Sequence, residues 1–285
     1  MLVRARHANQ EAPGRTPARR YYGSVTGQAF HDWGAFEDAV ASTIAAVKNR
    51  RRSPSAVVFF RGQGAGGGYG LTPSLLRPLA DRWYTPADEH ELFYEFQSRG
   101  GAILPPALDS WDLLFLMRHH GAPTRLLDWS EGFAAALFFA LREEDAGRDL
   151  DLWLLDPYAL NGATCGIDDV LDVRTDLKQS YFEYFVEGRA MPEWSHAVAI
   201  YPHRRSARLS GQLATFTLHA SCTPLEQTGL PGLTRLTLDA SGRKDAERYL
   251  EMAGINDFSL YPDLDGLAAL LRRRFRPHGD CAWPS

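Results

Sequence analysis

Two short stretches hold the residues whose types could do chemistry. In the first, VVFFRGQGAGGGYG at 57–70, Arg61 follows four apolar residues and Gly62 follows Arg61. A charged residue at the end of an apolar strand costs desolvation energy unless it is paired or points into a polar cleft. A guanidinium can bind a phosphate through two hydrogen bonds, and the bare backbone at Gly62 lets a ligand approach. Arg61 and Gly62 therefore favour a phosphate-binding site.

The second stretch, MRHHGAPTRLLDWSEGFAAALFFA at 117–140, gathers polar residues between two apolar runs. Taken singly, each has an ordinary structural interpretation: helix-end histidines cap carbonyls, an arginine and an aspartate pair, a tryptophan packs in the core, and a serine caps the next helix. Polar residues gathered between buried elements usually line a site. We therefore expect a second wall of the cleft from His119, His120, Arg125, Asp128, Trp129 and Ser130.

The glycines of the first stretch match G-x-G-x-x-G but do not predict a dinucleotide-binding loop of the Rossmann type. That fingerprint needs a helix directly after the glycines, so that the helix N-terminus holds the pyrophosphate. Here Leu71-Thr72-Pro73 follows, and Pro73 disfavours helical geometry at Thr72. A P-loop is also excluded, because no Gly-Lys-Ser/Thr follows.

Metal ions and disulfides are not expected. Adjacent histidines point in different directions on a helix, so His119 and His120 do not predict a shared metal site. The three cysteines, Cys165, Cys222 and Cys281, are far apart and odd in number. This pattern gives neither a zinc spacing nor a disulfide framework, and it favours a reducing cytoplasm.

The elements that must position these residues follow from hydrophobic periodicity and capping. We expect Asp32 to cap the first helix and Ser110 to cap the helix that leads to His119 and His120. Arg61 is expected at the end of the first strand. Helices are expected at about 32–50, 87–100, 110–120, 132–144, 177–187, 241–254 and 263–274, and strands or extended segments at 56–60, 125–129, 149–156, 197–202, 208–220 and 233–239. The helices cluster in the first half and the strands in the second, which predicts an α+β fold with a mainly helical N-terminal half.

Composition bounds the function classes. The chain has 285 residues, 45% of them hydrophobic and 23% charged, with a net charge of −4. These values are ordinary for a globular protein and give no bulk attraction for nucleic acid. No apolar run approaches the ~20 residues of a membrane span. Residues 1–25 are basic and lack periodicity, so we expect a disordered N-terminal arm.

The motifs together resemble a known family, the FRG domain, which is named for its Phe-Arg-Gly. The resemblance covers about 32–275, so residues 26–276 are interpreted as a single FRG domain with a short tail at 277–285. The segments that carry it are FFRGQ at 59–63, LTPSLLR at 71–77, WDLLFLMRHHGAPTRLLDWS at 111–130, AALFFA at 135–140, RLSGQLATFTLH at 208–219 and YPDLDGLA at 261–268.

The resemblance implies a bacterial toxin or anti-phage setting and a more distant kinship to ADP-ribosyltransferases, which have a split β-sheet core. In that enzyme class an Arg-Gly at a strand end holds NAD, a later strand leads through a Ser into a helix, and a last strand bears a Glu. Arg61-Gly62 is similar to the first element, and 127–130 to the second. The third position falls near Gln212, where there is no Glu, so Asp128 or Glu131 are the nearest acids by motif.

The resemblance therefore implies that NAD is the substrate. Arg61, with Gly62 beside it, would hold the pyrophosphate, and Asp128 or Gln212 would contact the ribose. Ser130 would be the catalytic serine of the motif. The other implied roles are positioning of NAD by Gln63, Thr124, Arg125 and Trp129, and acceptance of a proton by His119 or His120. The acceptor is left open between protein and nucleic acid, and an antitoxin is an expected partner. Two alternatives stay open: an NAD hydrolase with the same site, and a non-catalytic module that binds a nucleotide or a partner.

Overall fold

The computed structural model describes residues 25–64, 70–142, 148–189, 194, 196–202 and 213–275. The strands are β1 (Thr26–Phe30), β2 (Phe59–Gly64), β3 (Leu126–Ser130), β4 (Leu150–Leu155), β5 (Leu171–Asp172), β6 (Ala197–Tyr201), β7 (Ala214–His219) and β8 (Leu233–Leu238). The α-helices are α1 (Trp33–Arg51), α2 (Pro86–Gly100), α3 (Ser110–His119), α4 (Phe133–Arg142), α5 (Pro157–Thr164), α7 (Arg243–Met252), α8 (Asp257–Leu260) and α9 (Leu264–Arg274). Short helical turns are η1 (Ser74–Leu76), η2 (Phe182–Val186), η3 (Leu225–Gln227) and η4 (Ala240–Gly242).

The described strands form one mixed, open sheet in the order β1-β8-β4-β2-β3-β7-β6-β5. Its two outer pairs, β1–β8 and β5–β6, are parallel, and the inner pairs are antiparallel. A mixed sheet with helices interspersed along the chain is compatible with the α+β class predicted from the sequence.

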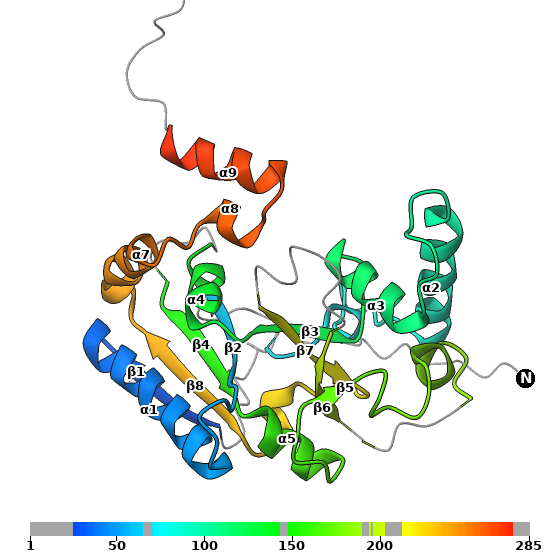
Figure 1. Ribbon diagram of the computed structural model, residues 1–285, viewed down its shortest axis with the longest axis horizontal. Coiled ribbons are helices and arrows are strands. Elements are labelled where there is room, and N and C mark those ends of the chain that lie inside the picture. Colours follow the sequence, from blue (N-terminus) through cyan, green and yellow to red (C-terminus); the bar gives the residue numbers. More distant parts are fainter. Residues whose placement is uncertain are drawn as a thin grey trace, which may run out of the picture.

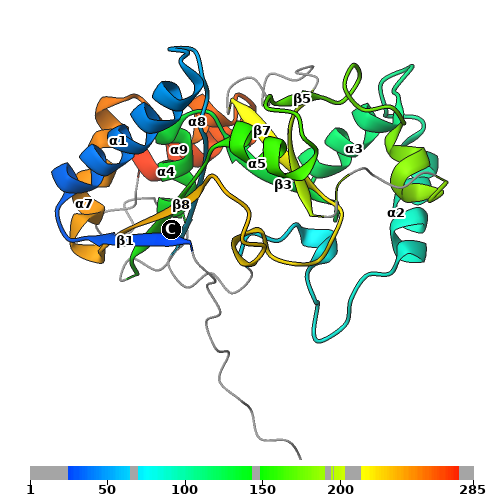
Figure 2. The same cartoon turned by 90° about the horizontal axis from the view of Figure 1, so that it is seen from below.

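The helices pack on the sheet to form two hydrophobic clusters, and alternate residues of β6 belong to different clusters: Ala197 and Ala199 to one, Val198 and Ile200 to the other. In Figure 1, α1, α4 and α7 lie beside the β1-β8-β4-β2 half, whereas α2 and α3 lie beside the other half. Figure 2 shows α1 above β1 at one end of the molecule, and α2 and α3 at the opposite end. One cluster is centred on residues such as Phe36, Phe59 and Trp153, and the other on residues such as Trp111, Tyr181 and Phe216.

Of three local predictions, the cap of α1 is confirmed, whereas the cap of α3 and the end of the first strand are wrong. Asp32 caps α1 by accepting a hydrogen bond from the Ala35 amide at 2.9 Å. The cap of α3 is Asp109, whose carboxylate accepts from the Asp112 amide, and not Ser110, which is already the first helical residue. The strand predicted to end at residue 60 begins at Phe59 and continues to Gly64, because it pairs with β4 along its whole length. Arg61 therefore lies inside a strand and not at its end.

The N-terminal strand was missed by sequence reasoning. β1 pairs in parallel with β8, more than 200 residues later in the chain, from Thr26↔Thr234 to Phe30↔Leu238. The expected arm at 1–25, apart from Val25, and the tail at 277–285 lie outside the described residues. Across the described ranges, no helix has the length and apolar character needed to cross a membrane.

Candidate functional site

The centre of the sheet is a joint at which β2 and β3 meet. These two strands are paired at a single position, Phe60↔Ser130, whereas β2 and β4 are paired at six positions from Phe59 to Gly64. The same line of paired residues extends across the sheet to β7, because Ser130 is paired with Ala214. The register therefore brings Arg61, Ser130 and the first residue of β7 to the same level of the sheet.

Arg61 bridges this joint. Its guanidinium Nη1 donates a hydrogen bond to the Asp128 carbonyl oxygen at 2.8 Å. In register it is paired with Trp153 of β4, and the side chain is half-buried. The two walls predicted from the sequence thus meet at Arg61 and Asp128.

Asp128 is held by a residue that sequence reasoning did not select. Arg118, in the last turn of α3, forms a bidentate ion pair with the Asp128 carboxylate. Its Nε donates to Oδ1 at 3.0 Å, and its Nη2 donates to Oδ2. Arg118 Nη1 also donates to the Ser74 hydroxyl at 3.3 Å. The sequence signal was present, because a basic residue directly precedes the histidine pair, but nothing in the sequence shows that α3 ends beside β3.

This pairing keeps Asp128 ionised. Burial alone would raise the pKa of the carboxyl, but the charge and hydrogen bonds of Arg118, together with the charge of Arg61, lower that pKa below its usual value. The Asp128 side chain still exposes 42% of its surface, against 21% for Arg118. A partly exposed carboxylate therefore lies at the joint, and Arg118 is bonded to both of its oxygens.

Gly62 has a packing role. A Cβ built at this position would lie 1.9 Å from the Ala136 carbonyl oxygen, so only glycine allows α4 to lie this close to β2. Gln63, two residues after Arg61 and thus on the same face of β2, is half-buried and is paired in register with Asp151. No observation tests their predicted contacts with NAD.

Ser130 ends β3 and begins the approach to α4. Its hydroxyl accepts a hydrogen bond from the Gly132 amide at 3.0 Å, and the residue is 3% exposed. The next residue, Glu131, donates its backbone N–H to the Leu213 carbonyl oxygen at 3.0 Å, which places Glu131 at the beginning of β7. Gln212 lies outside the described residues, so its predicted place beside Ser130 stays a prediction.

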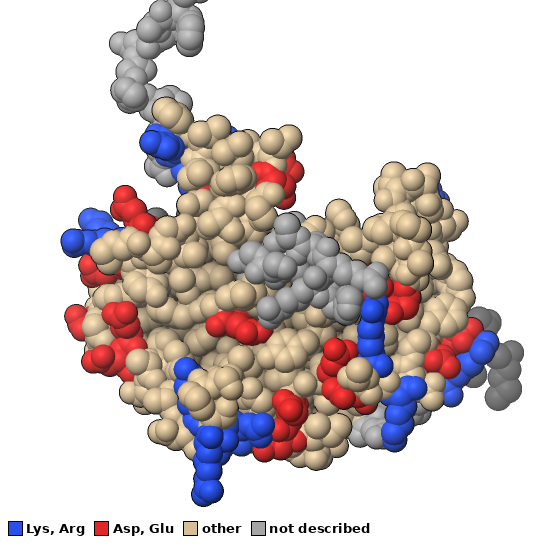
Figure 3. Space-filling view, in the orientation of Figure 1, with Lys and Arg blue, Asp and Glu red and all other residues tan. Residues whose placement is uncertain are grey.

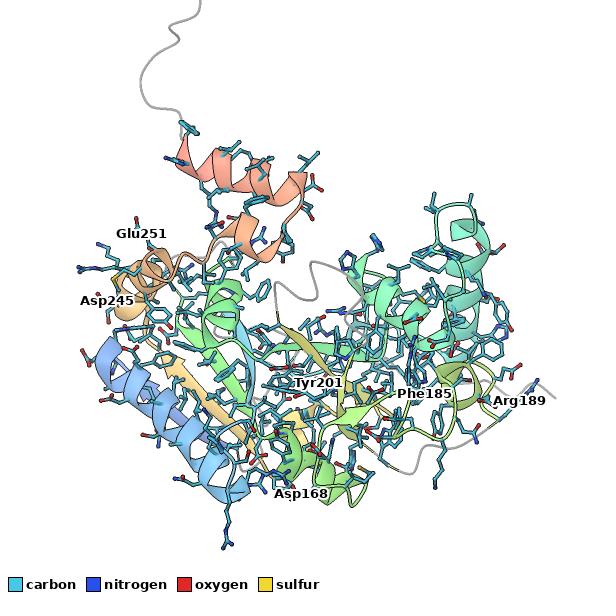
Figure 4. The ribbon with its side chains drawn as sticks, viewed as in Figure 1. Asp168, Phe185, Arg189, Tyr201, Asp245 and Glu251 are labelled. Carbon is cyan, nitrogen blue, oxygen red and sulfur yellow. The ribbon has the colours of Figure 1, made fainter. Side chains whose placement is uncertain are left out.

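Arg125 belongs to a separate buried cluster. Its guanidinium makes three hydrogen bonds of 2.6–2.9 Å to the Glu89 carboxylate of α2, and the Tyr181 hydroxyl donates to the same carboxylate at 2.5 Å. The guanidinium also lies 4.6 Å from the centroid of the Phe185 ring. Phe185 is labelled in Figure 4, in the half of the molecule that contains α2 and α3. Arg125 is therefore not paired with Asp128, and its contacts tie α2 to the start of β3.

Trp129 and Thr124 are likewise engaged by the protein. The Trp129 indole Nε1 donates to the Thr217 hydroxyl at 3.0 Å, and that hydroxyl lies 2.9 Å from His219 Nε2. Burial, with the charges of Arg125 and Arg61, lowers the pKa of His219 to about 3. Thr124 is 1% exposed, and its carbonyl oxygen accepts from the Leu75 amide of η1 at 3.2 Å. These residues are therefore bonded to other parts of the protein around the site.

His119 and His120 lie at the end of α3, next to Arg118. Their ring centroids are 4.8 Å apart, and His120 is the exposed C-cap residue of the helix. Within the described residues no group of three His, Cys, Asp or Glu side chains is placed to hold a metal ion. Half-buried His119 and exposed His120 thus form a rim next to Arg118 of the Arg118–Asp128 ion pair.

A comparison with protein-family models finds one match, to the FRG domain, over residues 56–149. That range contains β2, η1, α2, α3, β3 and α4, and thus the whole Arg61–Asp128–Arg118 arrangement. The chain carries an FRG domain. No curated protein and no solved structure matches the chain.

The FRG domain match ends before β4, although β4 is paired with β2 along its whole length. The matched range thus supplies both walls of the joint. The rest of the sheet comes from β1, which precedes that range, and from strands that follow it, including β7 and β8. The 26–276 range interpreted from the sequence as one FRG domain is longer than the matched segment.

Proposed function

We propose that this FRG-domain protein is an ADP-ribosyltransferase that uses NAD as its substrate, acting as a bacterial toxin or anti-phage effector on a protein or nucleic-acid acceptor. The observation that carries the proposal is the joint. The register Phe60↔Ser130↔Ala214 aligns the Arg-Gly strand, the strand that ends in Ser, and the first residue of the strand that follows Gln212. Such an alignment is what a transferase with a split sheet needs.

In the proposed reaction the bond between nicotinamide and C1′ of the ribose breaks, and neutral nicotinamide leaves with the electron pair. The acceptor nucleophile forms a new bond to C1′ and loses a proton. Arg61 would bind the pyrophosphate, since its guanidinium lies at the joint, beside the Asp128 carbonyl oxygen, and a guanidinium binds phosphate oxygens through directed hydrogen bonds. His119 or His120, at the rim, would accept the proton.

The acid that stabilises the positive charge on the ribose is proposed to be Asp128 or Glu131. Asp128 is ionised and partly exposed, but Arg118 neutralises much of its charge. Glu131 is bonded through its backbone to Leu213, next to the place where the transferase glutamate is expected. Comparison of Asp128→Asn with Glu131→Gln therefore assigns the role.

One observation supports a second function. If Asp128 is the only acid near the ribose, its ion pair with Arg118 leaves little net charge for catalysis. The protein would then be a nucleotide-binding module without chemistry. The two functions differ in turnover and not in binding.

The test is incubation of the purified protein with NAD labelled in the adenosine part, in cell extract, with nicotinamide release measured in parallel. We expect a labelled polymer with wild-type protein and an at least ~100-fold lower rate with Arg61→Ala. Arg99→Ala is the matched control, because Arg99 is 82% exposed and is paired with Glu95 on α2, so its rate should be unchanged.

Each outcome has a meaning. Nicotinamide release without a labelled polymer indicates a hydrolase. A rise in melting temperature with NAD, without turnover, indicates the binding module. No turnover and no binding refutes an NAD site. Thermal melts of Arg61→Ala are needed as a control, because this side chain also bridges β2 and β3.

A further inference from the structure

The C-terminal helix α9 contacts the rest of the molecule through one face. Gly266 is its buried residue, and a Cβ there would lie 2.0 Å from the Tyr261 carbonyl oxygen. On the same face, Arg273 Nε lies 3.2 Å from the carboxylate of Asp257, a residue of α8 that is 2% exposed. Figure 1 shows α9 at the outer edge of the molecule, next to α8. The contacts with α8 therefore fix which way the opposite face of α9 points.

That opposite face is apolar and exposed. Leu264, Ala268, Leu271 and Phe275 follow one another at spacings of four, three and four residues, which places them on one stripe of the helix. Leu264 is 82% exposed, Leu271 42% and Phe275 70%. Exposed apolar residues that form a contiguous stripe mark an interaction surface. These four residues are called the α9 stripe below.

Charged residues flank the α9 stripe in a pattern that is complementary to itself. Asp263 and Asp265 lie at the N-terminal end of the helix, and Arg272 and Arg274 lie in its last turn. All four are exposed, and none forms an ion pair with another residue of the described ranges. Figure 3 shows acidic atoms at one end of α9 and basic atoms at the other.

Helical spacing places Asp265 and Arg272, seven residues apart, on one flank of the stripe, and Asp263 and Arg274, eleven residues apart, on the other. Both pairs are centred on the peptide between Ala268 and Ala269. A helix with this symmetry matches a copy of itself that runs in the opposite direction. The small side chain of Ala268, the stripe residue next to this centre, also lets two helix axes approach closely.

We propose that the α9 stripe is a self-association surface, on which a second copy of this chain packs its own α9 in antiparallel orientation. Leu264 of each copy contacts Leu271 of the other. Asp265 faces Arg272 of the second copy on one flank, and Asp263 faces Arg274 on the other. The same patch serves both copies, as a two-fold symmetric dimer requires.

A surface of one helix is small, so the dimer is weak and sensitive to salt. Interfaces at the low end of the size range are those of transient complexes. A dissociation constant on the order of tens of micromolar is expected at ~0.1 M salt, and weaker association at ~1 M salt, where exposed ion pairs are screened. The proposal does not depend on NAD chemistry, and its test uses no activity.

The test is sedimentation equilibrium of the full chain from about 1 to 500 µM. Asp265→Arg alone and Arg272→Asp alone each place like charges opposite one another twice per dimer, and each should weaken association at least ~10-fold. The double variant Asp265→Arg/Arg272→Asp restores both pairs with the signs exchanged, and should return to within ~3-fold of wild type. Circular dichroism melts show whether α9 remains folded in each variant.

Leu271→Ser should also weaken association at least ~10-fold. The matched control is Ile103→Ser, which removes another exposed apolar side chain (87% exposed) in the α2–α3 connection and should leave association unchanged. A wild-type protein that stays monomeric throughout the range overturns the proposal. So does a dimer that neither Leu271→Ser nor the single charge reversals weaken, and a dimer that the double variant fails to restore overturns the antiparallel register.

Discussion

Removal of the Glu89 carboxylate should destabilise the protein more than any single change at the surface. Glu89 is 5% exposed and receives three hydrogen bonds from Arg125 and one from the Tyr181 hydroxyl. Glu89→Ala leaves the Arg125 guanidinium, only 13% exposed, without its counter-ion, and leaves the Tyr181 hydroxyl without its acceptor. Breaking a buried pair in this way costs about 3–5 kcal/mol of unfolding free energy, which corresponds to a melting temperature lower by roughly 10 °C.

The measurement is urea unfolding of the wild-type protein and three variants, the first of which is Glu89→Ala. Glu95→Ala is the matched control, because it removes a glutamate that is paired with an arginine four residues away on the exposed face of the same helix. It should unfold at nearly the wild-type urea concentration. The triple variant Glu89→Leu/Arg125→Met/Tyr181→Phe removes all the polar groups together and should regain most of the lost stability.

The reasoning is refuted if Glu89→Ala costs less than about 1 kcal/mol, or if the triple variant is no more stable than Glu89→Ala. Either result would mean that the cluster is hydrated in solution, since water would then replace the lost partner.

Two further changes test the packing and the titration of the core. Gly62→Ala should prevent stable folding or cost several kcal/mol of unfolding free energy, because a Cβ would overlap the Ala136 carbonyl oxygen. The control is Gly162→Ala on α5, where a Cβ meets nothing within 4 Å, and it should be neutral or slightly stabilising in thermal melts. His219 has a pKa of about 3 when folded and 6.5 when unfolded, so the unfolded state binds a proton that the folded state does not, and wild-type stability falls as pH decreases from about 6.5 to about 3 by up to ~1.4 kcal/mol per pH unit. His219→Gln keeps a hydrogen-bonding group for Thr217 but does not titrate, so its stability relative to wild type should rise between pH 7 and pH 4. A constant difference across that range would contradict the burial of a neutral imidazole.

Local features of the fold were predictable from the sequence because neighbouring residues determine them. Asp32 caps α1 since its side chain reaches a backbone N–H three residues ahead, and the alternation in DLDLWLLD identifies β4. The parallel strand β1 was not predictable, because its partner is far away in the sequence and TGQAF has no strong alternation. The length of β2 beyond Phe60 was set by pairing with β4, which overrides the low strand propensity of its glycines.

The candidate site could be predicted as a meeting of two segments but not as a set of contacts. The polar residues between apolar runs predicted that the segments of Arg61 and Asp128 lie together, and the two residues are in contact. The side-chain partners of Arg125 and Asp128 were not predicted. Arg125 is bonded to Glu89, which lies 36 residues earlier, and Asp128 is bonded to Arg118 across a helix end. Such pairings depend on the angle at which a helix meets a strand, and no sequence pattern reports that angle.

The joint between β2 and β3 also bears on how such a protein can evolve. Arg61 forms the side-chain bridge across a place where the two strands share one paired position, and it is also the residue proposed to bind phosphate. A lineage that lost the chemistry would therefore not be free to lose the arginine, because the arginine would still be needed to hold two halves of a sheet together. The presence of Phe-Arg-Gly in a distant sequence thus reports shared architecture first, and shared activity only when the second wall is present as well.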